Sequence, residues 1–225
     1  MTAVGRPPDG CAVRPSREPD RVYNGRVSAD PLIDAQARAV LDRLEARDAE
    51  ERQRGTSRAE RLRQITPDVG RFLQALVLAA RPRSIVEIGT SGGYSTVWIG
   101  TAARAVGASV TTLEVDPAKV RLARTTIDDA GLTATVSIVE GDAFAYLSGS
   151  AEPQDFVFLD AEKEDYLAFL ELVAPRLKPG GVLVADNLTS HTEDLAEFRD
   201  AALSDPRLAA VVVPIGRGEL LAVRV

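Results

Sequence analysis

The sequence predicts a doubly wound α/β domain with a mostly parallel sheet. Five short apolar runs rich in Val and Ile alternate with helical segments, and two further apolar runs near the C-terminus are joined only by IGRG. Apolar strands that alternate with helices are typical of a parallel sheet covered on both faces, with right-handed crossovers. The C-terminal pair leaves no room for a helix, so we expect an antiparallel hairpin that closes the sheet.

The expected strands and helices alternate from residue 84 onward. We expect strands at 84–89, 109–114, 134–139, 155–160 and 181–186, and helices near 95–106, 117–130, 163–174 and 191–204. A helix over 67–81, with apolar residues at helical spacing, precedes the first strand. The runs LAAVVVP and ELLAVRV form the closing hairpin.

Two segments precede this alternation. Residues 1–29 contain four prolines among mixed charges and few large apolar groups, which predicts a flexible tail. Residues 31–54 carry an apolar stripe at helical spacing, with Asp30 as the expected N-cap and Pro31 at the first helical position. We therefore expect a tail at 1–29 and a single domain at 30–225, with a helical cap at 30–66 and the α/β core at 67–225.

Charge and cysteine content narrow the choice of partners. The chain has 27 basic and 33 acidic residues, a net charge of −6, and no long block of one sign. Nucleic acid and membrane surfaces are therefore not expected as partners. Cys11 cannot form an internal disulfide, and no apolar leader or membrane-spanning run occurs, so we expect a cytoplasmic protein. We also expect a homodimer, with the helix at 31–54 as a candidate interface.

A glycine-rich turn, EIGTSGGYS, follows the first strand. Glycines let the backbone approach a ligand closely, and the helix after the turn offers free N–H groups to an anion. The dinucleotide pattern G-x-G-x-x-G is absent because Ser91 occupies the position of its second glycine. Glu114 ends the second strand 21 residues after Gly93, where it can accept hydrogen bonds from a ribose. A tight turn and a strand-end acid with no ligand remain the alternative.

Asp142 follows the third strand in VEGDAF, at the same edge of the sheet. Its carboxylate is placed to accept a hydrogen bond from an adenine amino group, and the N–H of Ala143 to donate one to a ring nitrogen. The alternative is an ordinary turn with an N-cap. Open α/β sheets bind their ligands outside the carboxyl ends of their strands, which favours a site.

Strands four and five also end in polar residues. Asp160 ends FLD, and Asp186 and Asn187 end VLVADN, so adjacent strands would bring two carboxylates and one amide oxygen together. Three oxygen ligands suit Mg²⁺ better than zinc. The alternative for the Asp-Asn pair is a helix cap or an Asx-turn. Lys163, three residues after Asp160, is one of few lysines in an arginine-rich chain and can lose its proton where arginine cannot.

Six motifs occur together in order and spacing: EIGTSGGYS, LEVDP, EGDA, FLDAEKEDY, LKPGGVLVADN and PIGRGELL. With them, residues 60–225 resemble the cation-dependent small-molecule O-methyltransferases that include catechol O-methyltransferase and the caffeoyl-CoA type enzymes. The resemblance implies a Rossmann-like, seven-stranded sheet whose last strand is antiparallel. It also implies S-adenosylmethionine and Mg²⁺, or another divalent cation, as cofactors.

The resemblance also implies roles for individual residues. Asp160, Asp186 and Asn187 match the metal ligands, and Lys163 matches the general base, so Asp160 and Lys163 are the expected catalytic pair. Glu114 matches the ribose acid, and Asp142 and Ala143 match the adenine contacts. The remaining expected cofactor contacts are Ile65, Glu87, Gly89, Thr90, Ser91, Gly93, Tyr94, Ser95, Val115 and Asp160.

The chain departs from the family after Asn187. Many members continue there with an apolar loop containing Trp and Gly, whereas this chain continues with LTSHTEDLAEF. We expect Ser190 and Glu193 to form a capping box and the acceptor pocket to be more open. His191 is either a second base or acceptor contact, or a solvent-facing residue. Glu162, Glu164 and Asp165 are expected to face water at a helix start, and Trp98 to lie in the core.

These observations predict a Mg²⁺-dependent O-methyltransferase that uses S-adenosylmethionine and acts on a hydroxyl of a small catechol-like or natural-product acceptor. Two alternatives remain open. The first is a metal-independent methyltransferase of the same fold that acts on a different acceptor. The second is a ligand-binding relative without turnover.

Overall fold

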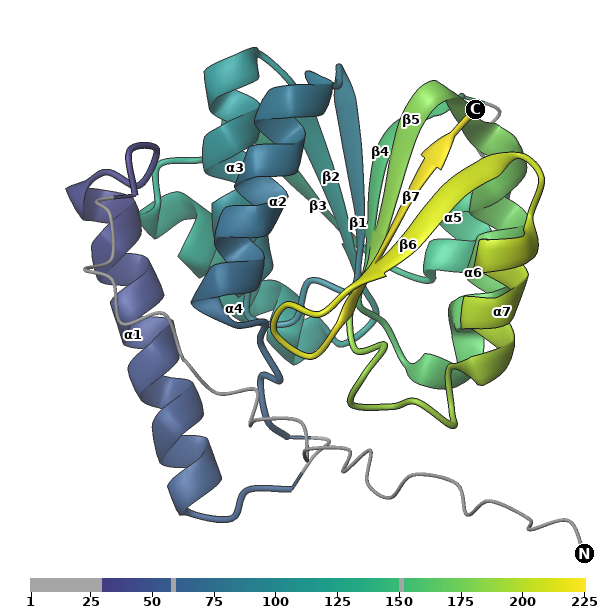
Figure 1. Cartoon of the computed structure of the whole chain (residues 1–225). Coiled ribbons are helices and arrows are strands. Elements are labelled where there is room, and N and C mark those ends of the chain that lie inside the picture. The colour runs from purple at the N-terminus through teal and green to yellow at the C-terminus, as the bar shows by residue number, and fades with distance from the viewer. Residues whose placement is uncertain (1–29, 58–59, 150–151) are drawn as a thin grey trace, which may run out of the picture. The chain divides into compact units, whose positions relative to one another are not determined.

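A seven-stranded sheet in the order β3-β2-β1-β4-β5-β7-β6 forms the centre of the structure, a computed structural model that describes residues 30–57, 60–149 and 152–225 (Figure 1). The tail expected at 1–29, with Cys11, lies outside the described residues. The strands are β1 (Ser84–Ile88), β2 (Ser109–Glu114), β3 (Val136–Glu140), β4 (Gln154–Leu159), β5 (Leu177–Ala185), β6 (Leu208–Val213) and β7 (Glu219–Arg224). Strands β1 to β5 pair in parallel. Strand β7 pairs antiparallel with both β5 and β6, which confirms the expected closing hairpin.

Helices cover both faces of the sheet. The helices are α1 (Ala35–Gln53), α2 (Pro67–Ala80), α3 (Tyr94–Val106), α4 (Pro117–Asp129), α5 (Ala143–Gly149), α6 (Tyr166–Val173) and α7 (Ala196–Ser204), with 3₁₀ turns at Lys163–Asp165 and Ala174–Arg176. Helices α1 to α4 pack on one face and α5 to α7 on the other (Figure 1). None of the helices in the described part of the chain is long and apolar enough to span a membrane.

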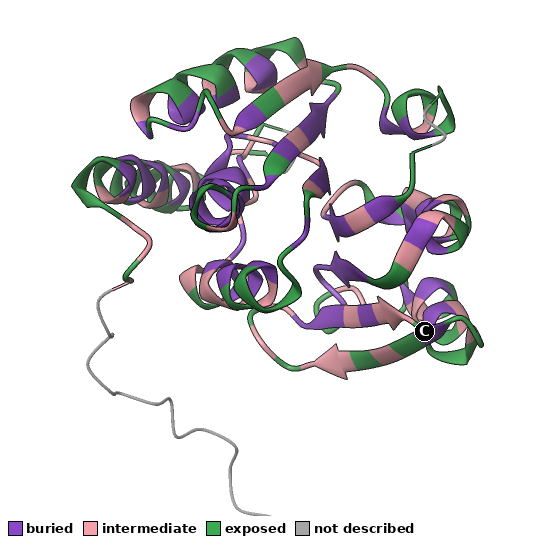
Figure 2. Ribbon diagram, turned by 90° about the horizontal axis from the view of Figure 1, so that it is seen from above, coloured by how far each residue is buried: buried purple, intermediate pink, exposed green. Residues whose placement is uncertain are grey.

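Strand β4 shows how the sequence builds a core on each side. Phe156 and Phe158 belong to the apolar cluster beneath α1 to α4, whereas Val157 and Leu159 belong to the cluster beneath α5 to α7. Successive side chains of a strand point to opposite faces, so a strand covered on both sides must be apolar throughout. Figure 2 shows the buried residues concentrated on the strands and on the helix faces that meet them. The expected core position of Trp98 is confirmed, since its side chain is fully buried.

Helix starts were the least accurate expectations. Helix α1 begins at Ala35 rather than near residue 31, because the Asp34 side chain, not Asp30, accepts the capping hydrogen bond from the N–H of Ala37 at 2.9 Å. Helix α7 begins at Ala196, and the expected capping box at Ser190 does not form. The Ser190 hydroxyl donates instead to the backbone oxygen of Asn187 at 3.3 Å. Helix α5 was not expected at all.

Candidate active site

A cavity of about 440 Å³ lies at the carboxyl edge of the sheet. It is lined by the segments that follow β1 to β5 and by the turn between β6 and β7. The strand order reverses between β1 and β4, the position at which doubly wound sheets bind their ligands. The expected site residues that line the cavity are Gly89, Thr90, Ser91, Tyr94, Ser95, Glu114, Val115, Asp142, Ala143, Asp160, Lys163 and Asn187. The other expected residues are buried and do not belong to this lining: Ile65, Glu87, Gly93 and Asp186.

The glycine turn after β1 packs closely against the residue that follows β4. Gly89 has φ +98°, and a Cβ at this position would lie 2.3 Å from the backbone oxygen of Asp160. Gly93, with φ +88°, is the N-cap of α3. Only glycine combines this backbone conformation with such a close approach. The turn therefore exposes backbone without side chains at the cavity, one strand away from Asp160.

Glu114 is held rigidly at the end of β2. One carboxylate oxygen accepts a hydrogen bond from the N–H of Ser91 at 2.8 Å, and the other accepts from the N–H groups of Val115 and Asp116, each at 3.0 Å. An ionised carboxylate has about four acceptor positions, so at least one remains for a ligand hydroxyl. The carboxylate therefore remains available for the expected ribose contact.

Glu87 supports the turn from behind instead of facing the cavity. Its fully buried carboxyl accepts hydrogen bonds from the hydroxyls of Ser95, Thr96 and Thr112 at 2.5 to 2.6 Å. Burial raises the pKa of Glu87 to about 7, against the lowering effect of these three hydrogen bonds. Glu87 therefore orients Ser95 at the cavity wall.

The far end of the cavity combines a polar turn with an aromatic wall. The Asp142 carboxylate accepts a hydrogen bond from the N–H of Phe144 at 2.8 Å. The ring of Phe144 stacks on Phe169 with a centroid distance of 3.9 Å, and both residues line the cavity. A flat apolar surface beside a carboxylate and the N–H of Ala143 suits a heteroaromatic ring with an amino group.

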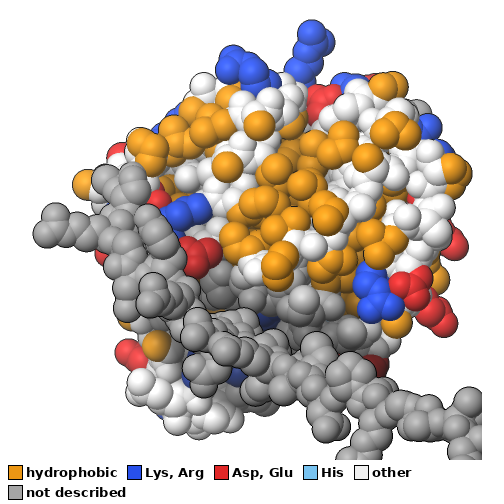
Figure 3. Space-filling model, viewed as in Figure 1, with side chains coloured by type: hydrophobic (Ala, Val, Ile, Leu, Met, Phe, Trp, Pro, Cys, Tyr) orange, Lys and Arg blue, Asp and Glu red, His pale blue; other side chains and the backbone are white. Residues whose placement is uncertain are grey.

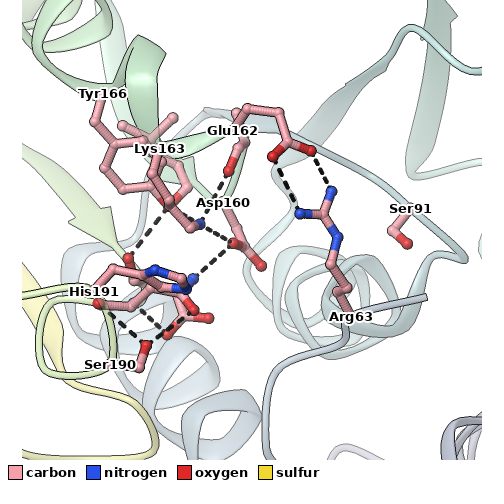
Figure 4. A network of polar contacts seen from close by, with 12 residues as sticks. Arg63, Ser91, Asp160, Glu162, Lys163, Tyr166, Ser190 and His191 are labelled. Carbon is pink, nitrogen blue, oxygen red and sulfur yellow. Dashed lines mark hydrogen bonds and ion pairs between the residues drawn. The ribbon is translucent and has the colours of Figure 1, made fainter. Parts of the chain in front are cut away.

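Lys163 lies at the opposite end, between β4 and α6 (Figure 4). Its Nζ lies 3.0 Å from Asp160 Oδ1, 3.0 Å from the backbone oxygen of Ala161 and 2.7 Å from the hydroxyl of Tyr166. These three acceptors match the three donors of a lysine ammonium. Tyr166 is fully buried, and its hydroxyl is also within hydrogen-bond distance of the backbone oxygens of Leu159 and Asp186. Tyr166 therefore fixes the position of the amine.

Asp160, Asp186 and Asn187 come together at the ends of β4 and β5. Asn187 Nδ2 lies 3.0 Å from Asp160 Oδ1, and the N–H of Asn187 donates to the Asp186 carboxylate at 2.6 Å. Burial, followed by the charge of Asp160, raises the pKa of Asp186. Glu219, at the start of β7, is fully buried, and burial followed by the charge of Asp186 raises its pKa well above the ordinary range. Several acids thus crowd together beside Lys163.

This donor set fits a hard divalent cation. It provides two carboxylates and an amide oxygen, and the negative charges of the partly buried Asp160 and the buried Asp186 disfavour one another. No group of three or more His, Cys, Asp or Glu side chains that could hold a metal occurs in the described ranges, so an amide ligand such as Asn187 would be required. The adjacency of β4 and β5 confirms that the two strand ends meet.

Of the acids after Asp160, Glu162 and Glu164 are exposed, as expected, and Asp165 is partly buried. Glu162 and Asp165 also line the cavity, which was not expected. Glu162 forms a bidentate ion pair with Arg63, which lies on the segment before α2 and has φ +48° (Figure 4). His191 also lines the cavity, with its Nδ1 3.1 Å from the Asp194 carboxylate.

Sequence reasoning missed four residues that shape the site: Tyr166, Phe144, Glu219 and Arg63. Tyr166 and Phe144 resemble ordinary core residues in the sequence, and Glu219 starts an apolar strand. The one signal for Glu219 was a carboxylate at the start of the apolar run ELLAV, because acidic residues are rarely buried without a partner.

The fold and the cavity define the class of protein first. A parallel sheet closed by an antiparallel hairpin, with a glycine turn after β1 and an acid at the end of β2, is the arrangement of a nucleoside-binding α/β protein. Residues 86–188 match a family model described as a methyltransferase domain.

Several known proteins are similar to this chain. A catechol O-methyltransferase from Niastella koreensis is 38% identical over 128 residues, covering 55% of this chain and 58% of that protein. One from Mycobacterium tuberculosis is 37% identical over 138 residues, covering 61% and 62%. The aligned part of this chain thus spans about three fifths of the length of either protein.

Two further similarities extend over more of the relative. A protein from Mycobacterium sp. (strain JLS) that carries the name O-methyltransferase is 31% identical over 174 residues, covering 71% of this chain and 79% of that protein. The crystal structure of an O-methyltransferase from Bacillus cereus in complex with SAH is 28% identical, with a TM-score of 0.71 over 83% of this chain and 91% of that one. The chain belongs to the class I S-adenosylmethionine-dependent O-methyltransferase family.

Proposed function

We propose that the protein transfers a methyl group from S-adenosylmethionine to a hydroxyl of a small catechol-like acceptor, with the help of Mg²⁺ or another divalent cation. One observation carries the proposal: Asp160, Lys163 and Asn187 line the same cavity as the glycine turn and Glu114. This arrangement supports the proposal that a proton acceptor and a set of oxygen ligands lie beside a nucleoside site.

The donor end supplies binding and orientation. Glu114 would accept hydrogen bonds from the ribose, and the bare backbone at Gly89 would admit the methionine part of the cofactor. The stacked ring of Phe144 would cover the adenine. The cofactor supplies an electrophilic methyl group, and holding both reactants in line can provide much of the rate enhancement.

The acceptor end supplies the proton chemistry. A neutral hydroxyl is a weak nucleophile until its proton leaves, and Lys163 is the group placed to receive that proton. The three acceptors around Nζ, the Asp160 carboxylate, the backbone oxygen of Ala161 and the hydroxyl of Tyr166, would hold the ammonium formed by proton transfer. Tyr166 acts through Lys163 and is a positioning residue. A bound divalent cation would be held by Asp160, Asp186 and Asn187 and would stabilise the developing oxyanion.

Substitution of the acids tests this proposal. Asp160→Ala and Asp186→Ala should each lower the rate of methyl transfer to catechol by about 100-fold or more, because both the cation and its charge stabilisation are lost. Asp128→Asn on the exposed side of α4 removes the same charge away from the cavity and should leave the rate unchanged. Full activity in both alanine variants would favour a metal-independent methyltransferase. Calorimetry that detects no binding of S-adenosylmethionine would favour a relative without turnover.

We also propose that the protein forms a homodimer. The apolar stripe of α1, the interface considered first, is buried within the chain: Val40, Leu41 and Leu44 are at most 3% exposed. Figure 3 shows hydrophobic side chains gathered on the surface that carries α2 and the β6–β7 hairpin. Val211 there is 52% exposed. Light scattering should give twice the chain mass, and Val211→Asp should shift it toward the monomer.

A further inference from the structure

Arg217 is a cation of the cavity wall whose side chain has no polar partner among the described residues. It lies in the turn between β6 and β7, is half-buried and lines the cavity. Its backbone oxygen accepts hydrogen bonds from the N–H of Thr189 at 2.8 Å and of Ser190 at 3.2 Å, which docks the turn onto the segment after β5. Its guanidinium has no hydrogen bond or ion pair with any residue that the structure describes.

The other cations of the wall differ from Arg217. Arg52 and Arg61 lie 2.6 and 3.8 Å from the carboxylate of Asp48, and Arg63 is paired with Glu162. Lys163 is held by Asp160. Lys119 is the remaining lining cation without an ion pair among the described side chains, and it belongs to α4, after β2.

Sheet topology separates these two unpaired cations. Strands β1, β4 and β5 lie between β2 and β7. At about 4.8 Å per strand, the ends of β2 and β7 are about 19 Å apart. Lys119 therefore belongs to the nucleoside end. Arg217 lies one strand from Asp186 and Asn187, at the end where the acceptor hydroxyl must reach Lys163.

We propose that Arg217 binds a carboxylate of the acceptor, so that the preferred acceptors are catechols that carry an acid group. This inference rests on the proposed function. The planar guanidinium presents paired donors that match the two oxygens of a carboxylate. Because the pair Arg63–Glu162 is already neutral, the positive charge left at this end is that of Arg217, and an acceptor with one negative charge complements it.

The test compares 3,4-dihydroxybenzoate with its uncharged methyl ester, at saturating S-adenosylmethionine and Mg²⁺. The wild-type protein should prefer the acid in kcat/KM. Arg217→Met should raise KM for the acid about tenfold to a hundredfold, the range expected for a charge-assisted hydrogen-bonded pair, and leave the ester unchanged. Arg217→Lys should give a KM for the acid between those of the wild-type protein and Arg217→Met. Arg121→Met, on the exposed face of α4, is the charge-matched control and should behave as wild type.

Calorimetry of the same variants separates the two proposals. With S-adenosylhomocysteine bound, the acid should bind more weakly to Arg217→Met than to wild type, while S-adenosylhomocysteine itself binds equally well. Equal losses for the acid and the ester, or weaker S-adenosylhomocysteine binding, would overturn the inference, because Arg217 would then serve the cofactor or the fold. A wild-type protein that binds the acid through Arg217 but methylates neither acceptor would contradict the proposed function alone.

Discussion

At the β2 end of the cavity, Glu114 accepts hydrogen bonds from three backbone N–H groups, whereas at the β4–β5 end Asp160 and Asp186 crowd together with Lys163 and the buried Glu219. The first carboxylate is satisfied by the fold itself. The second pair is not, because burial, followed by the nearby charge of Asp160, raises the pKa of Asp186. Under the proposed function, the β2 end would bind the nucleoside, and the β4–β5 end would hold a divalent cation and accept a proton.

The largest effect should come from the acceptor end. Lys163→Arg keeps the positive charge near Asp160 but removes a group that can receive a proton. We expect kcat to fall by about 10²- to 10⁴-fold, the usual contribution of a general base. S-adenosylhomocysteine affinity, measured by calorimetry, should not change. Unchanged turnover in this variant would remove Lys163 from the proton-transfer step.

The next largest effect should come from Gly89, where the turn after β1 meets the backbone of Asp160. Gly89→Ala would place Cβ 2.3 Å from the backbone oxygen of Asp160, at φ +98°. We expect the free energy of unfolding to fall by about 3 kcal/mol or more, from the left-handed backbone and the overlap together. Gly107→Ala is the matched control, since Gly107 has φ +76° but no atom within 4 Å of the added Cβ. Equal losses in urea unfolding would show that the close approach costs nothing.

The next effect concerns Glu87, the buried acid behind the glycine turn, which should make stability depend on pH. Glu87 has a pKa of about 7 when folded, against an ordinary value of 4.5. The folded protein therefore keeps a proton that the unfolded chain releases, so this contribution to stability falls as pH rises from about 4.5 to about 7 and is constant above. Over this pH range, the loss in the free energy of unfolding that Glu87 causes is about 3 kcal/mol.

Glu87→Gln should remove that pH dependence, and Glu140→Gln, on the exposed end of β3, should retain it. Thermal unfolding of the three proteins between pH 5 and pH 8 measures the difference. Parallel curves for wild type and Glu87→Gln would mean that Glu87 is ionised in the folded state.

The smallest effect should come from the ion pair across the cavity. The side chains of Arg63 and Glu162 are 26% and 53% exposed, and exposed pairs contribute little. A double-mutant cycle with Arg63→Met and Glu162→Gln should give a coupling below about 1 kcal/mol in urea unfolding. A larger coupling would indicate that this pair helps to hold the two ends of the cavity together.

The strands were predictable because each is a run of Val, Ile, Leu or Phe long enough to be buried on both faces. Helix starts were not, since Asp30 and Asp34 are both good caps and only the packing of α1 selects Asp34. Within the site, Gly89 and Asp160 directly follow strands and Glu114 ends one, so their place at the sheet edge follows from topology. Tyr166 was missed because its partners, Lys163 and the backbone of Asp186, meet only in the folded chain.

The difference between the two ends is tested most directly by removing divalent cations. Methyl transfer to a catechol acceptor and binding of S-adenosylhomocysteine would be measured on the same protein, in EDTA and after Mg²⁺ is restored. We predict that turnover is lost in EDTA and recovered with Mg²⁺, while S-adenosylhomocysteine affinity is unchanged in both. Turnover that stays intact in EDTA would contradict the role assigned to Asp160, Asp186 and Asn187.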